Sequence, residues 1–91
     1  MTQPRDPIHR PGDIVTGVVV EHRHFGVFLD IGDEEPALAV ITMIEDDPRA
    51  TPMLPPVSTS VEGVLLGYAG PGHQPRLSLR PSDIHQARAR R

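Results

Sequence analysis

Two phenylalanines, Phe25 and Phe28, are the residues whose type and spacing point most directly to a ligand. They lie in the segment HFGVFLDI, where Phe28 alternates with aliphatic residues in the period of two that a half-buried strand requires. The aliphatic residues are Val27, Leu29 and Ile31. If these face the core, Phe28 faces outward, and a bulge at Gly26 would turn Phe25 to the same side. Outward aromatic rings can stack on nucleic-acid bases with little sequence preference.

The charged side chains are unevenly distributed along the chain. All nine basic residues are arginine, and residues 76 to 91 contain five of them against a single acidic residue, Asp83. Residues 30 to 47 contain seven acidic residues and no basic one. In PRLSLR, Arg76 and Arg80 would share the outer face of a strand, and we expect them to contact phosphates if that strand lies near the aromatic one. Two solvated charged edges are the alternative, and the net charge of −3 excludes binding by bulk electrostatics.

The other candidate chemistry is weak. His22 and His24 would share a strand face, but a zinc site needs three or four converging ligands and no third ligand is evident. Adjacent carboxylates such as Glu34 and Glu35 are paired only in sequence, and general acid–base catalysis needs a pocket that separates their pKa values. The chain has no nucleophile elbow, phosphate-binding loop or dinucleotide-binding glycine pattern. We therefore expect no metal, no cofactor and no enzymatic activity.

Length and composition limit the organisation of the chain. Ninety-one residues suffice for one core, and the absence of cysteine leaves its stability to packing. Residues 1–11 are polar and rich in proline, so we expect a disordered leader, followed by a domain over residues 12–80. Residues 81–91 form an Arg-rich tail, a candidate frayed helix capped by Ser82. The lack of a signal or membrane segment predicts a cytoplasmic location with no membrane partner, and arginine in place of lysine suggests a GC-rich bacterial source.

Five short strands account for residues 12–80. The expected strands cover Asp13–Glu21, Phe25–Ile31, Ala37–Ile41, Val61–Tyr68 and Pro75–Arg80. A helical turn capped by Thr42 would follow the third strand, and prolines make residues 48–60 a connecting loop. This pattern predicts an all-β fold, a five-stranded antiparallel Greek-key barrel of the oligonucleotide-binding type (OB-fold).

The segments GDIVTGVVV, HFGVFLDI and PRLSLR together resemble the S-one RNA-binding domain, the repeat of the largest small-subunit ribosomal protein. The resemblance covers Gly12 to about Arg80. It implies that Phe25 and Phe28 form a base-stacking platform and that Arg76 and Arg80 occupy the family's basic positions. The chain departs from the family in its third strand, where ALAVIT places Val40 at the usual histidine position. An aspartate that is common at the end of the fourth strand is also missing.

Two functions remain open from the sequence. The leading hypothesis is a weak, sequence-tolerant module for RNA or single-stranded nucleic acid, which uses Phe25, Phe28, Val40, Arg76 and Arg80. The alternative is a protein-interaction module that uses the same face, because Val40 and the acidic residues shift the surface toward what a protein partner prefers. One ring tucked under the proline loop is the structural alternative to a platform. We expect a monomer by default.

Overall fold

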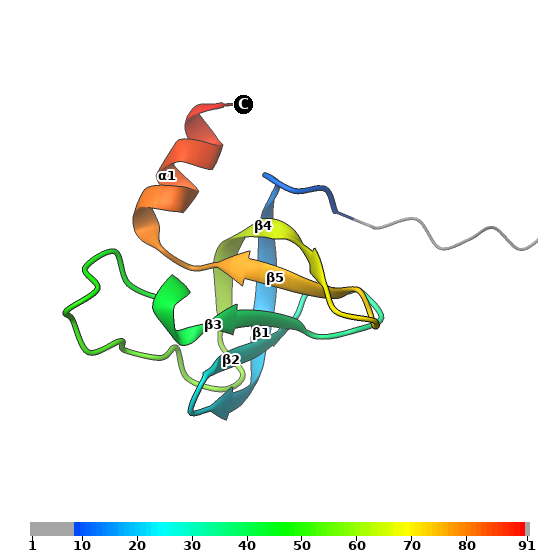
Figure 1. Cartoon of the computed structure of the whole chain (residues 1–91), viewed down its shortest axis with the longest axis horizontal. Coiled ribbons are helices and arrows are strands. Elements are labelled where there is room, and N and C mark those ends of the chain that lie inside the picture. The colour runs from blue at the N-terminus through cyan, green and yellow to red at the C-terminus, as the bar shows by residue number, and fades with distance from the viewer. Residues whose placement is uncertain (1–8, 91) are drawn as a thin grey trace, which may run out of the picture.

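Five strands hydrogen bond in the order β1-β2-β3-β5-β4 and close into a barrel in the computed structural model, which describes residues 9–90 (Figure 1). The strands are β1 (Ile14–Arg23), β2 (Gly26–Asp30), β3 (Ala37–Val40), β4 (Ser60–Ala69) and β5 (Gln74–Ser78). The 3-10 helix η1 (Ile41–Met43) follows β3, and the helix α1 (Pro81–Ala89) follows β5. The prediction of five strands with a helical turn after the third is confirmed, but the N-cap residue of that turn is Val40 and not Thr42.

The prediction that all strands are antiparallel is wrong at one place. Strands β3 and β5 run parallel and pair through Leu38 and Arg76, whereas the other four neighbouring pairs are antiparallel. The reason is geometric, because strand direction cannot alternate throughout a closed ring with an odd number of strands. This parallel contact brings the second half of the chain beside β3.

The long strand β1 belongs to both halves of the barrel. Its β-branched residues favour an extended strand, and Val15 and Val19 are buried in the core. Its first half pairs with β4 and its second half with β2, and the register with β2 shifts between Val19 and Glu21. The irregularity therefore lies in β1 rather than at Gly26, where the sequence had suggested a bulge.

The core includes the three aliphatic residues around β2 that alternation predicted, and residues of the other strands join them. Val27, Leu29 and Ile31 are buried, together with Ala37 and Ala39 of β3, Leu65 of β4 and Leu77 of β5. Ser78 differs from expectation. It lies on the outer face of β5 but is fully buried, because the Asp83 carboxylate of α1 accepts its hydroxyl hydrogen bond at 2.6 Å.

The segment before β1 is hydrogen-bonded to β4. Gly12 N–H donates to the Leu65 carbonyl at 2.7 Å, and the Tyr68 hydroxyl donates to the His9 carbonyl at 3.0 Å. His9, which the sequence placed in a disordered leader, is thus hydrogen-bonded to the barrel. Residues 1–8 of that leader lie outside the described residues.

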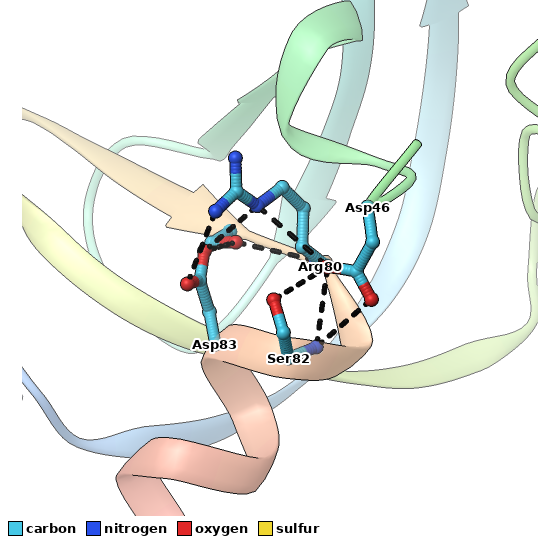
Figure 2. A network of polar contacts seen from close by, with 5 residues as sticks. Asp46, Arg80, Ser82 and Asp83 are labelled. Atoms are coloured by element: carbon cyan, nitrogen blue, oxygen red, sulfur yellow. Dashed lines mark hydrogen bonds and ion pairs between the residues drawn. The ribbon is translucent and has the colours of Figure 1, made fainter. Parts of the chain in front are cut away.

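Helix α1 covers part of the outer face of the barrel and packs against β4 and β1. Ala87 is the buried residue of this helix, and Arg88 donates to both carboxylate oxygens of Glu62 on β4 at 2.8 Å. Its N-cap residue is Arg80, with Pro81 in the first turn, so Ser82 is not the cap that the sequence suggested. The Asp46 carboxylate instead accepts the Ser82 N–H at 3.2 Å, which satisfies a donor that a helix leaves free at its start (Figure 2). Within residues 9–90 no helix has the length and apolar character needed to cross a membrane.

Candidate nucleic-acid interface

Phe28, Leu38 and Arg76 lie in one row across three adjacent strands. Phe28 of β2 pairs with Leu38 of β3, and Leu38 pairs with Arg76 of β5. Residues that pair across neighbouring strands project to the same face of the sheet. All three lie on the outer face, because the residues before and after Leu38, namely Ala37 and Ala39, belong to the core. The fold therefore brings an aromatic ring and a guanidinium to the two sides of one leucine.

The second ring stands at the tip of the β1–β2 hairpin. Phe25 and Phe28 have ring centroids 5.9 Å apart with their planes at 88°, and His24 contacts Phe25 edge-on at 5.2 Å. The Phe25 side chain is 39% exposed, whereas Phe28 is half-buried. The Phe25 carbonyl accepts the Ile41 N–H at 2.8 Å, which ties this hairpin to η1. The two rings thus form an edge-to-face pair that is partly exposed.

Gly26 permits this arrangement. It has φ +155°, and a Cβ atom at this position would lie 2.2 Å from the Ala39 carbonyl oxygen. Such an approach to a backbone atom cannot be relieved by a side-chain rotation, so β2 and β3 meet closely only because residue 26 is glycine. The close approach holds Phe25 beside the end of β3.

An apolar floor separates the rings from the arginine. Leu38 is only 6% exposed although it lies on the outer face and outside the core cluster. Val40 lies two residues further on the same face, half-buried and opposite Gly26. The valine that replaces the family's usual histidine therefore extends an apolar surface and offers no hydrogen bond. We call the group formed by Phe25, Phe28, Leu38, Val40 and Arg76 the platform.

Arg76 is the platform's cation. Its side chain is half-buried, its Nε is shielded from solvent without a hydrogen-bond partner, and it makes no ion pair among the described residues. A shielded donor that lacks a partner costs about 1 to 3 kcal/mol, and more when the group is charged. A phosphate or carboxylate from a bound partner would remove part of this cost.

Arg80, the other predicted basic residue, is held within the protein. Its guanidinium lies 3.1 Å from the Asp83 carboxylate through Nε and 3.4 Å through Nη2, and 3.9 Å from Asp46 (Figure 2). The Nε contact is an ion pair without the alignment of a hydrogen bond. Figure 2 shows the two carboxylates on opposite sides of Arg80, one from α1 and one from the segment after η1. Its charge is thus shared by two acidic groups of the same chain.

The other side chains around the platform contact neighbouring residues of the same chain. His22 Nε2 lies 2.6 Å from the Pro55 carbonyl and so links the end of β1 to the proline loop. Across residues 9–90 no group of three or more histidine or acidic side chains could hold a metal ion. Arg23 pairs with Glu21 at 2.5 Å, and Glu21 lies opposite Phe28. Sequence reasoning missed Leu38 and the acidic partners of Arg80, since these depend on the β3–β5 contact and on the position of α1.

Comparison with known proteins supports the fold assignment. No family model matches the chain, and no curated protein matches its sequence. Solved structures do match. The solution structure of GSP13 from Bacillus subtilis superposes with a TM-score of 0.64 at 20% identity, over 87% of this chain and 59% of that one. This chain has an S-one-like OB fold.

Two further solved structures match this chain with similar TM-scores. A chain of the a/eIF2alpha–aDim2p–rRNA complex from Pyrococcus horikoshii matches with a TM-score of 0.67 at 18% identity, over 92% of this chain and 52% of that one. A protein described as an exosome complex RNA-binding protein matches with a TM-score of 0.64 at 18% identity, over 81% of this chain and 45% of that one. This chain therefore spans about half the length of these three solved chains, and the likeness is one of fold.

Proposed function

We propose that this S-one-like domain is a binding module for short single-stranded RNA, and not an enzyme. The observation that carries the proposal is the row of Phe28, Leu38 and Arg76, which combines an accessible aromatic pair with a cation that has no acidic partner in the described chain. Stacking platforms next to basic side chains are the usual means of binding single strands. Solved structures with this fold include an rRNA complex and a protein described as RNA-binding, which supports the same conclusion.

In the proposed complex, one base stacks on Phe28 and a neighbouring base packs against Phe25. Each stacked base contributes about 1 to 3 kcal/mol. A phosphate between or beside these bases meets Arg76 and supplies the acceptor that its guanidinium lacks. Val40, which is half-buried, contacts the apolar face of a base or ribose. Because no side chain of the platform reads a base edge as Asn or Gln would, binding is weak and tolerant of sequence.

We assign Arg80 a different role from the one expected of the isolated sequence. Two carboxylates of the same chain already compensate its charge, and an approaching phosphate would be repelled by both. Arg80 therefore positions α1 and η1 beside the end of β5. The phosphate contact rests on Arg76 alone.

A protein partner is the second candidate function. Val18 and Val20 on the outer face of β1 are 40% and 47% exposed, and Val18 pairs with Asp30 of β2. This exposed aliphatic surface lies on β1, which is the strand next to β2 of the platform. Exposed apolar surface of this kind is typical of protein interfaces. A partner captured through Val18 and Val20, with Phe28 dispensable, would favour this function.

Titration of labelled single-stranded RNA tests the proposal. Anisotropy is measured with the wild-type chain, Arg76→Gln and Arg90→Gln at two salt concentrations. Arg90 is an exposed arginine at the end of α1, so its replacement removes the same charge away from the platform. We expect Arg76→Gln to weaken binding and to lower the salt slope by about 0.7, and Arg90→Gln to change neither by much. Flat anisotropy for the wild-type protein at high concentration would refute the proposal.

A further inference from the structure

Acidic side chains lie beyond the platform where β2 turns into β3. Asp30 projects from the outer face of β2 two residues after Phe28, which places the two Cα atoms about 7 Å apart along the strand. The Asp30 carboxylate accepts the Gly32 N–H, and the Asp33 carboxylate accepts the Glu34 N–H, both at 2.9 Å. Glu35 is exposed. Among residues 9–90 no ion pair compensates the carboxylate of Asp30 or that of Asp33.

A second acidic group lies beyond the other end of the platform. Ile41 follows Val40 directly and begins η1. Beyond it, Glu45, Asp46 and Asp47 line a hollow of about 360 Å³ together with residues of the proline loop. The Asp46 carboxylate accepts a hydrogen bond from Ser82 and lies 3.9 Å from Arg80. Glu45 has no hydrogen bond or ion pair within the described chain. Acidic side chains therefore lie beyond both ends of β3, in the turn before it and in the segment after η1.

We infer that these two acidic ends restrict the RNA site to a short segment, at or below the ~4 nucleotides that mark the small end of OB-fold site sizes. The inference rests on the proposed function. A strand that continued along β2 and β3 would bring its phosphates near Asp30 at one end and near Glu45 at the other. At about 7 Å and low salt, one carboxylate weakens the binding of one phosphate about threefold. Only the middle of the platform, beside Arg76, attracts a phosphate.

The double variant Asp30→Asn with Glu35→Gln tests the turn. Both replacements keep a side-chain oxygen, so the acceptor for the Gly32 N–H remains. The probes are fluorescent oligouridines of 4 and 12 nucleotides, titrated at low salt. We expect the variant to bind the 12-mer roughly three- to tenfold more tightly than the wild type does and to leave the 4-mer within about twofold. The longer strand offers more binding registers, but this factor is the same for both proteins, so it drops out of the ratio of the variant's affinity to the wild type's affinity.

A control separates local repulsion from overall charge. Gln86→Lys with Ala89→Lys changes the net charge by the same two units on exposed positions of α1, which packs against β4 and β1. We expect this control to change the two oligouridines equally. Thermal melts followed by circular dichroism verify that both double variants fold.

The outcomes are distinguishable. An equal gain for the 4-mer and the 12-mer in Asp30→Asn with Glu35→Gln would overturn the inference and leave the proposed function standing. So would a length-dependent gain of the same size in the α1 control. If the wild-type chain and every variant fail to bind either oligouridine, the proposed function fails and the inference fails with it.

Discussion

Leu38 and Arg76 face each other across the parallel contact between β3 and β5, although 37 residues separate them in the chain. This contact decides what the outer surface of the barrel can bind. It places a guanidinium that has no acidic partner among residues 9–90 beside a buried leucine and, one strand further, a phenylalanine. Under the proposed function, a nucleotide would place its flat base against the aromatic ring and its phosphate beside the guanidinium.

Replacing Phe28 by alanine tests the aromatic half of the platform. We expect the affinity for single-stranded RNA to fall about 5- to 150-fold, because one stacked base contributes about 1 to 3 kcal/mol. Anisotropy titration measures the change, and a thermal melt verifies the fold, since Phe28 is half-buried. Leu66→Ala is the control, because Leu66 is an exposed apolar residue of β4. An unchanged affinity in folded Phe28→Ala would remove base stacking from the proposal.

The Arg80→Gln variant tests whether Arg80 contributes to RNA binding as Arg76 is proposed to do. We expect RNA affinity to stay within about twofold of the wild type, because the charge of Arg80 is already shared by Asp46 and Asp83. Stability should fall by about 0.5 to 2 kcal/mol, since exposed ion pairs contribute about 0.2 to 1 kcal/mol each. Urea unfolding measures the loss. A drop in RNA affinity as large as that of Arg76→Gln would return Arg80 to the binding surface.

Gly26→Ala tests the close approach of β2 and β3. The new methyl group would lie 2.2 Å from the Ala39 carbonyl oxygen at φ +155°, so we expect a loss of about 2 kcal/mol or more in unfolding free energy. Gly32→Ala is a matched control, since Gly32 has φ +87° with nothing near its Cβ position, and it should cost about 1 kcal/mol. Equal losses in chemical denaturation would show that the conformation of the residue, and not the contact with Ala39, limits this position.

The alkaline stability of the domain should depend on Tyr68. Burial raises the pKa of its hydroxyl above the ordinary value, and the Asp33 carboxylate adds to the shift. A raised pKa in the folded state stabilises the fold fully below pH about 10, and this contribution is lost as pH rises through the folded pKa. The chain has no lysine or cysteine, and arginine stays charged in this range, so no other side chain obscures the effect.

Two measurements check this expectation. The absorbance of the chain's single tyrosine titrates above pH 10 in the folded protein. The urea midpoint of the wild type should then be lower at pH 11 than at pH 8, whereas that of Tyr68→Phe should be nearly the same at both pH values. That variant also loses the hydrogen bond to the His9 carbonyl, so it should be less stable than the wild type at pH 8. A normal titration of Tyr68 in the folded chain would contradict the prediction.

The sequence alone determined the strands and most of the core. Alternation fixed the inward positions of Val27, Leu29 and Ile31, because a strand presents successive side chains to opposite faces. The same local rule placed Phe28 on the outer side, where it pairs with Leu38. These features depend on neighbours within a few residues, which is why they could be predicted.

Only the tertiary structure decided which residues share that surface. Arg76 and Arg80 were equivalent in sequence, but barrel closure set Arg76 beside Leu38, whereas the docking of α1 brought Asp83, and the segment after η1 brought Asp46, to Arg80. The same docking buried Ser78, which alternation had placed in solvent. Contacts between distant segments depend on how the chain closes and on which charges then meet, and no local pattern of residues contains that information.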